Sequence, residues 1–410
     1  MYNDKAMTKQ RIFFFLVTLI IVSVVATMVS FYARGWRFDT KNNEFSPNGL
    51  LVIKSAPDGA QILVNGKLET ATDATISLQP GTYDVQIQKE SYLAWNKRLV
   101  IEEEVVTEAT AHLFKSVPSL SAVSFSSCTN PTPSYDMTKI AYVVLPDQNG
   151  NGVETSGLWI MEMLNLPLGF ARDPKRITDG NLTGAVLEWS PNGREILLTT
   201  NTGSFLLDAS KFTPQSQRTN ITIGKEKVLT EWQTEADKKL KAQITKLPDE
   251  LESLVKRKMK AIVFSPDEDM VVYTASESAK IPDDLIKQLP GASTQKQERD
   301  IKSNHTYVYD IKEDRNFLID TNAGDLIIEG GYQTPAVRRL SWFITSRHLV
   351  LAENDKITIL DYDGTNRQTV YAGSYLTPHA FPTLSLDRLI ILTNLGATST
   401  PANLYSLSIK

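Results

Sequence analysis

The feature that most constrains this chain is an uninterrupted apolar segment near its N-terminus, residues 12–32, which contains no charged side chain. As an α-helix it would be about 30 Å long, which matches the hydrocarbon layer of a bilayer. Tyr32 and Trp36 stand at one end of it, where an interfacial aromatic belt is expected. The sequence therefore predicts a transmembrane helix, with residues 1–11 as a cytoplasmic tail and residues 33–48 as a polar tether.

The orientation of this segment is not decided by its flanking charges. Three basic residues precede it and three follow it: Lys5, Lys9, Arg11, Arg34, Arg37 and Lys41. A short N-terminal tail needs no translocation, so we place it in the cytoplasm and the remainder outside. A cleaved signal peptide is the alternative, but its apolar region would be shorter and would end in small residues, whereas this one ends in Phe31 and Tyr32. We favour an uncleaved signal-anchor.

The overall composition excludes several classes of protein. The net charge of −4 offers no basic surface for nucleic acid. Cys128 is the single cysteine, so an intramolecular disulfide and a cysteine-based metal cluster are both excluded. A chain of 410 residues exceeds one ordinary core, and we expect a membrane segment plus two globular domains.

Residues 49–115 carry the period-two pattern of short β-strands. Ile62 and Val64 alternate with their neighbours and lead into Asn65 and Gly66, which both tolerate the positive φ of a type I′ turn. Further alternating segments are separated by turn-forming residues such as Pro80 and Gly81. The pattern predicts six or seven short strands in a small antiparallel β-sandwich.

Four short motifs in this region resemble the PEGA domain family. The signature itself is Pro57, Asp58, Gly59 and Ala60, with Asp58 in place of the usual Glu, and the others are Val64–Gly66, Leu78–Tyr83 and Tyr92–Trp95. The segment Ala71–Ala74 departs from the family pattern, which leaves the shape of that loop open. The resemblance implies a cell-surface module next to a membrane anchor, without known catalysis. We interpret Pro57, Gly59, Asn65, Gly66, Pro80 and Gly81 as structural turn residues.

The rest of the chain, residues 117–410, contains a divergent repeat. Each copy has a strand end, a turn of Ser-Pro type and a further β-rich strand, at Ser134–Asp136, Trp189–Arg194, Phe264–Asp267, Ser341–Trp342 and Phe381–Thr383. This pattern resembles the blades of TolB-like and Trp-Asp-like β-propellers. The resemblance implies a propeller with structural turn residues at Ser190, Pro191, Ser265 and Pro266. Five blades are visible, divergent copies would raise the number to six or seven, and the strand from Val117 to Phe125 is expected to close the ring with the last blade.

Two insertions interrupt the repeat. Residues 235–260 have helical periodicity, with Pro248 suited to the start of a second helix. Residues 276–304 are polar, and we expect a mobile loop. Insertions on one face of a propeller often carry recognition, so these two segments are the predicted partner site.

Motifs for chemistry are weak. The four histidines are scattered, and no common nucleophile, zinc or nucleotide motif occurs. Asp147, Asn149 and Asn151 imitate the start of a calcium loop, but its twelfth position is Leu158 and cannot supply the bidentate carboxylate. We therefore predict no catalytic residue, no metal and no cofactor.

The sequence as a whole predicts a mainly β protein with an N-terminal transmembrane helix, a PEGA-like sandwich and a β-propeller carrying a helical insertion. Its predicted role is membrane-anchored, extracytoplasmic binding or scaffolding, with an envelope protein or cell-wall glycan as partner and no nucleic acid. Two alternatives remain open. One is a propeller hydrolase or lyase, and the other is a sensor subunit of a cell-envelope complex.

Overall fold

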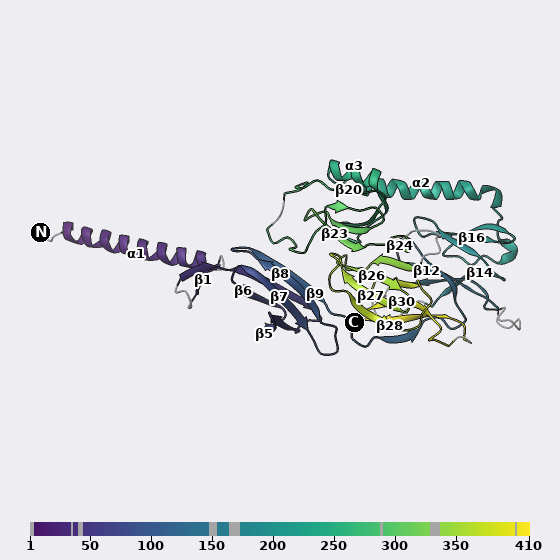
Figure 1. Ribbon diagram of the computed structural model, residues 1–410, viewed down its shortest axis with the longest axis horizontal. Helices are drawn as coiled ribbons and strands as arrows, with labels where there is room; N and C mark the ends of the chain where they lie inside the picture. Colours follow the sequence, from purple (N-terminus) through teal and green to yellow (C-terminus); the bar gives the residue numbers. More distant parts are fainter. Residues whose placement is uncertain are drawn as a thin grey trace. The chain divides into compact units, whose positions relative to one another are not determined.

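The computed structural model describes residues 4–33, 36–39, 44–146, 154–163, 173–287, 290–328, 337–397 and 400–410. The chain forms two compact units. Unit 1 contains Met1–Glu90, Ala94–Leu113 and Leu289–Gln295, and unit 2 contains Ser91–Leu93, Phe114–Gln288 and Lys296–Lys410. One apolar helix lies at the N-terminus, and several β-sheets follow it in the two units (Figure 1). This order confirms the predicted fold class, a mainly β protein with an N-terminal helix.

The N-terminal helix α1 (Asp4–Ala33) is longer than its apolar part. Within it, Arg11–Ala33 is apolar and long enough to cross a membrane, with a mean hydropathy of 2.9, and none of it is buried against the protein. A membrane anchor and a signal sequence both satisfy that test. The predicted tether is partly structured, because β1 (Trp36–Asp39) and β2 (Glu44–Pro47) pair as an antiparallel hairpin.

Seven strands of unit 1 form two sheets. In the first sheet, β3 (Gly49–Ala56) lies between β6 (Ala74–Leu78) and β9 (Val106–His112). The second has the order β5-β4-β7-β8, with β4 (Gln61–Val64), β5 (Lys67–Ala71), β7 (Gly81–Gln88) and β8 (Trp95–Ile101). The two sheets bury apolar residues that include Leu51, Ile53, Ile62, Ile87 and Trp95. The prediction of a wholly antiparallel sandwich is wrong at one place, since β3 and β9 run parallel.

Among the described residues, unit 2 contains five sheets of three to five strands, which we number 1 to 5, and one two-stranded sheet of β20 (Ala279–Lys280) and β21 (Asp300–Ile301) in the polar insertion. Sheet 1 contains β11 (Thr129–Pro133), β12 (Lys139–Val144), β13 (Gly157–Glu162) and β14 (Lys175–Asp179), and sheet 2 contains β15 (Val186–Trp189), β16 (Glu195–Thr200) and β17 (Gly203–Asp208). Sheet 3 contains β18 (Met259–Phe264), β19 (Met270–Ala275), β22 (Thr306–Asp310) and β23 (Arg315–Asp320). Sheet 4 contains β24 (Leu326–Ile328), β25 (Arg338–Trp342), β26 (His348–Glu353), β27 (Lys356–Asp361) and β28 (Gln368–Ala372).

Sheet 5 joins the two ends of unit 2. It contains β29 (Ala380–Pro382), β30 (Arg388–Thr393) and β31 (Asn403–Ser408), and its outer strand is β10 (Ser119–Ala122). Leu120 lies opposite Leu407 in the antiparallel register of β10 and β31. The predicted pairing with the last sheet of the chain is therefore confirmed, although the strand is shorter than the predicted Val117–Phe125.

The sheets of unit 2 pack face to face through separate apolar clusters. Sheet 1 packs on sheet 2, sheet 3 on sheet 4, sheet 4 on sheet 5, and sheet 5 on sheet 1. A protein without disulfides draws its stability from such burial. The remaining face of sheet 3 packs on two helices, α2 (Lys225–Ile244) and α3 (Asp249–Lys258), instead of on a sheet.

The helical insertion differs from its predicted bounds. Helix α2 begins at Lys225, ten residues before the predicted start at 235, and β18 already begins at Met259. The additional turns contain Val228, Leu229 and Trp232, which are half-buried at helical spacing between charged residues. Pro248 is the N-cap residue of α3, as its position in the sequence predicted.

Candidate functional site

The structure brings the two insertions together on one face of sheet 3. Leu251 and Val255 of α3 and Ile281 and Ile301 of the polar insertion belong to one buried cluster, with at most 2% of each side chain exposed. We name α2, α3 and residues 276–287 and 296–304 the insertion layer. Figure 1 shows α3 beside β20 (Ala279–Lys280) and β23 in unit 2. The layer is the candidate binding surface.

Helix α3 has a sequence that stabilises it in place. Its first turn contains Asp249, Glu250 and Glu252 and its last turn contains Lys256, Arg257 and Lys258, which is the charge order that the helix dipole favours. Leu251 and Val255 are four residues apart and therefore share the face that contacts sheet 3. Lys258 also forms an ion pair with Glu277, which connects the helix to the polar insertion.

The polar insertion is held by a buried ion pair. The Arg299 guanidinium lies 2.9 Å from Asp314 Oδ1, and their side chains are 8% and 0% exposed. Arg299 also donates to the backbone oxygens of Pro282 and Asp314, and the Leu285 N–H donates to Asp314 Oδ2. A buried charge is tolerated only when it is paired and hydrogen-bonded in this way. The polar composition predicted a mobile loop and gave no indication of this anchorage or of the pairing between β20 and β21 (Asp300–Ile301).

Buried tyrosines extend the same network into sheet 3. The Tyr309 hydroxyl donates to Asp314 Oδ1 at 2.6 Å, and the Tyr273 hydroxyl donates to Asn316 Oδ1 at 2.8 Å. Asn316 in turn donates to the Glu298 carbonyl. Burial raises the pKa of Tyr309, and the hydrogen bond to the Asp314 carboxylate raises it further. These phenols therefore stay protonated and act as hydrogen-bond donors that hold the insertion on the sheet.

Asp310, at the end of β22, is the most perturbed carboxyl group near the layer. It is 2% exposed, and burial raises its pKa to about 6 despite hydrogen bonds from the N–H groups of Lys312 and Glu313. A buried carboxylate with a raised pKa is a common feature of functional sites and also of structural networks. Because Asp310 is enclosed at a strand end, we assign it to the turn between β22 and β23.

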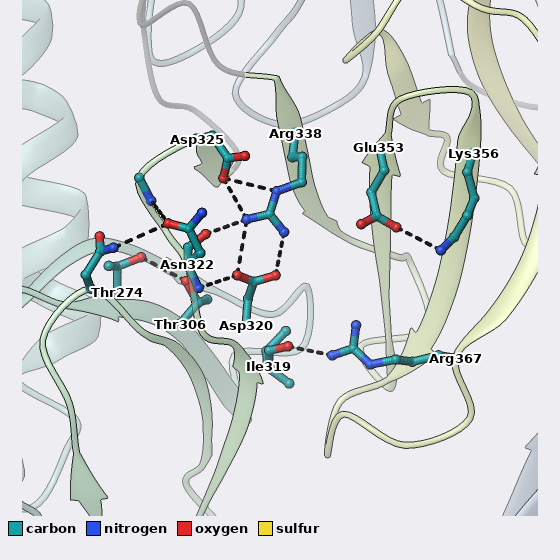
Figure 2. A network of polar contacts seen from close by, with 12 residues as sticks. Thr274, Thr306, Ile319, Asp320, Asn322, Asp325, Arg338, Glu353, Lys356 and Arg367 are labelled. Carbon is teal, nitrogen blue, oxygen red and sulfur yellow. Dashed lines mark hydrogen bonds and ion pairs between the residues drawn. The ribbon is translucent and has the colours of Figure 1, made fainter.

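A second polar network joins sheets 3 and 4 (Figure 2). Arg338, the first residue of β25, donates to Asp320 at 2.6 and 3.2 Å and to Asp325 at 3.1 and 2.7 Å. Hydrogen bonding to Asp320 raises the pKa of Arg338, and the same guanidinium lowers the pKa of Asp325. Arg367, which precedes β28 of sheet 4, donates to the carbonyl of Ile319 in β23 of sheet 3. This network fixes one sheet against the next.

One arrangement resembles acid–base machinery but is enclosed. His348 Nδ1 lies 2.8 Å from Thr345 Oγ1, and His348 Nε2 lies 3.6 Å from Asp361 Oδ1. The His348 side chain is 4% exposed, and the rings of Phe114 and Phe343 pack edge-on against it. A nucleophile and its base must reach a substrate, so we assign this trio to the packing of sheets 4 and 5. Among the residues that the structure describes, no three metal-binding side chains are grouped.

The predicted turn residues of the repeat lie between the first two strands of their sheets. The Ser190 hydroxyl donates to Asn192 Oδ1 at 2.9 Å and accepts a hydrogen bond from the Glu195 N–H at 2.9 Å. Pro191 is the residue between Ser190 and Asn192 in this turn. Ser265 makes the corresponding contacts with Asp267 Oδ1 at 2.6 Å and the Met270 N–H at 3.0 Å. Pro191 also accepts a hydrogen bond from Lys239 of α2 through its carbonyl. The structure thus places these turns beside the insertion layer.

The predicted PEGA-like residues lie at turns and edges of the small sandwich. Asn65 and Gly66 have φ values of 48° and 78°, as a type I′ turn between β4 and β5 requires. Pro57, Asp58 and Gly59 form the bend before β4, and Ala60 is buried with its N–H donating to Thr72 Oγ1. Pro80 and Gly81 lie where β7 begins. Asp147, Asn149 and Asn151 of the calcium-like segment lie outside the described residues.

Sequence reasoning missed the charged residues that organise the layer. Arg299, Asp314 and Arg338 stand among many polar residues, and nothing in their neighbourhood distinguishes them from solvated charges. The sequence feature that came nearest to indicating these residues was the pair Tyr307 and Tyr309 in β22. Buried tyrosine hydroxyls require polar partners, so such a strand implies polar groups packed against it.

Comparison with known proteins identifies the small sandwich. Residues 48–116 match the PEGA domain. The PEGA domain of this chain is thus one residue longer at each end than its predicted range, 49–115. No curated protein sequence matches the chain.

Solved structures similar to this chain include two TolB structures. One, from Agrobacterium tumefaciens, is 11% identical, covers 70% of this chain and 80% of its own, and has a TM-score of 0.23. The other, from Acinetobacter baumannii, is 13% identical, covers 80% of this chain and 60% of its own, and has a TM-score of 0.19. The predicted resemblance to TolB-like proteins is therefore found among solved structures, and TM-scores this low carry no further argument.

Proposed function

We propose that this protein is a membrane-anchored binding or scaffold protein whose PEGA domain and β-sheet unit lie outside the cytoplasm. The observation that carries the proposal is the apolar surface of α1, since Arg11–Ala33 is long enough to span a bilayer and none of it is covered by protein. Such a surface is stable only in lipid or against a partner. A PEGA domain directly after the span agrees with a module that stands next to a membrane.

The binding role is supported by the insertion layer of unit 2. Its inner side is fixed by buried leucine, tyrosine and ion-pair contacts, while its outer side presents charged residues of both signs, such as Lys238, Lys241 and Asp237. A rigid base with a polar outer surface is suited to recognising a protein partner. We infer that this surface contacts a protein of the cell envelope.

We expect a reporter enzyme that is active only outside the cytoplasm to be active when fused after Lys410. The physical reason is that α1 supplies the membrane-crossing segment and no charge interrupts it. The measurement is reporter activity in intact cells together with separation of membrane and soluble fractions. A matched fusion that lacks residues 4–33 should be inactive. An inactive reporter on the intact chain, with the fusion protein present in the cells, would contradict the proposal, and release of the active fusion as a shortened soluble protein would show a cleaved signal peptide.

We also expect charge reversal on the insertion layer to remove partner capture. Lys238→Glu with Lys241→Glu places two negative charges on an exposed stretch of α2. When membranes are treated with a crosslinker, the full chain should form a crosslinked species with its partner, and this variant should not. The control is Lys175→Glu with Lys211→Glu, which changes the net charge equally at exposed positions outside the layer. Equal crosslinking of both variants would show that the layer is not the binding surface. If the full chain is crosslinked to the same set of proteins in every preparation, the result would favour a sensor subunit of an envelope complex over a free-standing binding protein.

A further inference from the structure

An apolar recess of about 580 Å³ lies where α1 meets β1 in unit 1. It is lined by Met28, Val29, Phe31 and Tyr32 of α1 and by Trp36 of β1, and almost all of its surface is apolar. This volume falls within the range of about 300–1,000 Å³ that small-molecule sites occupy.

The wall opposite α1 is held in a defined orientation. The Trp36 indole Nε1 donates to Glu104 Oε1 at 2.6 Å, which directs the polar edge of the ring toward the PEGA domain. The ring centroids of Phe31 and Trp36 are 5.0 Å apart, so the two aromatic rings close one end of the recess. An indole whose N–H is satisfied presents only apolar surface on its remaining side.

We propose that this recess binds one acyl chain of a phospholipid in the membrane leaflet that the C-terminal end of α1 reaches. The inference rests on the proposed membrane anchoring. An apolar recess exposed to water would be unfavourable, whereas this one is continuous with the exposed apolar side of Arg11–Ala33, where lipid chains are the surrounding solvent. Tyr32 and Trp36 have the amphipathic side chains that favour the boundary between acyl chains and headgroups. The bound chain would fill the space between the anchor and the first strand after it.

The test uses the full chain in phosphatidylcholine vesicles that contain phosphatidylcholine with a photoreactive diazirine on one acyl chain. After irradiation, mass spectrometry locates the lipid adducts along α1 and β1. We expect adducts to be several-fold more frequent at Met28, Val29, Tyr32 and Trp36 than at Ser30. Ser30 lies at the same depth on the opposite face of the helix, at 3.6 residues per turn.

Matched variants separate a specific site from ordinary lipid contact. Val29→Trp fills the recess and should remove the several-fold enrichment, whereas Ser30→Trp adds a similar side chain on the opposite face and should leave it. Even labelling around the helix, or enrichment that survives Val29→Trp, would overturn the recess while the chain remains in the vesicles. Absence of the chain from the vesicle fraction would overturn the membrane anchoring, and the lipid site with it.

Discussion

Asp314→Ala is expected to destabilise unit 2 by about 3–5 kcal/mol, the cost of leaving a buried charge without its partner. Asp314 is fully buried and lies 2.9 Å from the 8% exposed side chain of Arg299. The same carboxylate accepts hydrogen bonds from the Tyr309 hydroxyl and the Leu285 N–H, which would also lose their acceptor. The free energy of unfolding is measured by chemical denaturation of the full chain in detergent, followed by tryptophan fluorescence.

The matched control for this variant removes the other acidic partner of the same arginine. Asp283 lies 3.3 Å from Arg299 Nε, but its side chain is 62% exposed. Because exposed ion pairs contribute little, Asp283→Ala should change the free energy of unfolding by less than about 1 kcal/mol. Similar losses from the two variants would show that burial does not distinguish the two carboxylates, and the account of the anchored insertion would then be wrong.

The second large effect is expected for Trp189→Ala, which should cost about 3–5 kcal/mol because it leaves a large cavity between two packed sheets. Trp189 is 1% exposed and belongs to the cluster that joins sheets 1 and 2. Its Nε1 also donates to the Thr132 carbonyl of the neighbouring sheet at 2.9 Å. The same denaturation measurement applies.

Trp189→Phe separates the two contributions of this side chain. Phenylalanine keeps much of the ring volume but cannot donate a hydrogen bond, so the variant leaves the Thr132 carbonyl without this donor and should cost about 1–3 kcal/mol. A loss for Trp189→Phe as large as that for Trp189→Ala would mean that the hydrogen bond, and not the packing, dominates. Wild-type stability in Trp189→Ala would contradict the tight contact between sheets 1 and 2.

The missed features of the fold share one physical cause. Arg299 pairs with Asp314 across fifteen positions and Arg338 with Asp320 across eighteen. Such a side chain is either a solvated charge or part of a buried ion pair, depending on which elements cover it. Periodicity along the chain does not indicate which elements these are. The start of α2 was missed because its half-buried residues lie between charges, so their apolar periodicity is weak. The parallel pairing of β3 with β9 likewise depends on how two distant strands meet.

The sequence by itself determined the features that local chemistry controls. A charge-free apolar stretch specifies the N-terminal helix, period-two alternation specifies the strands, and Asn65 with Gly66 specifies a tight turn, because each depends only on neighbouring residues. Tertiary structure alone decided that the two insertions join over sheet 3, that Arg299 and Asp314 are buried as a pair, and that Trp36 closes a recess against α1. These outcomes depend on burial and on contacts between distant segments, and only the folded chain brings those segments together.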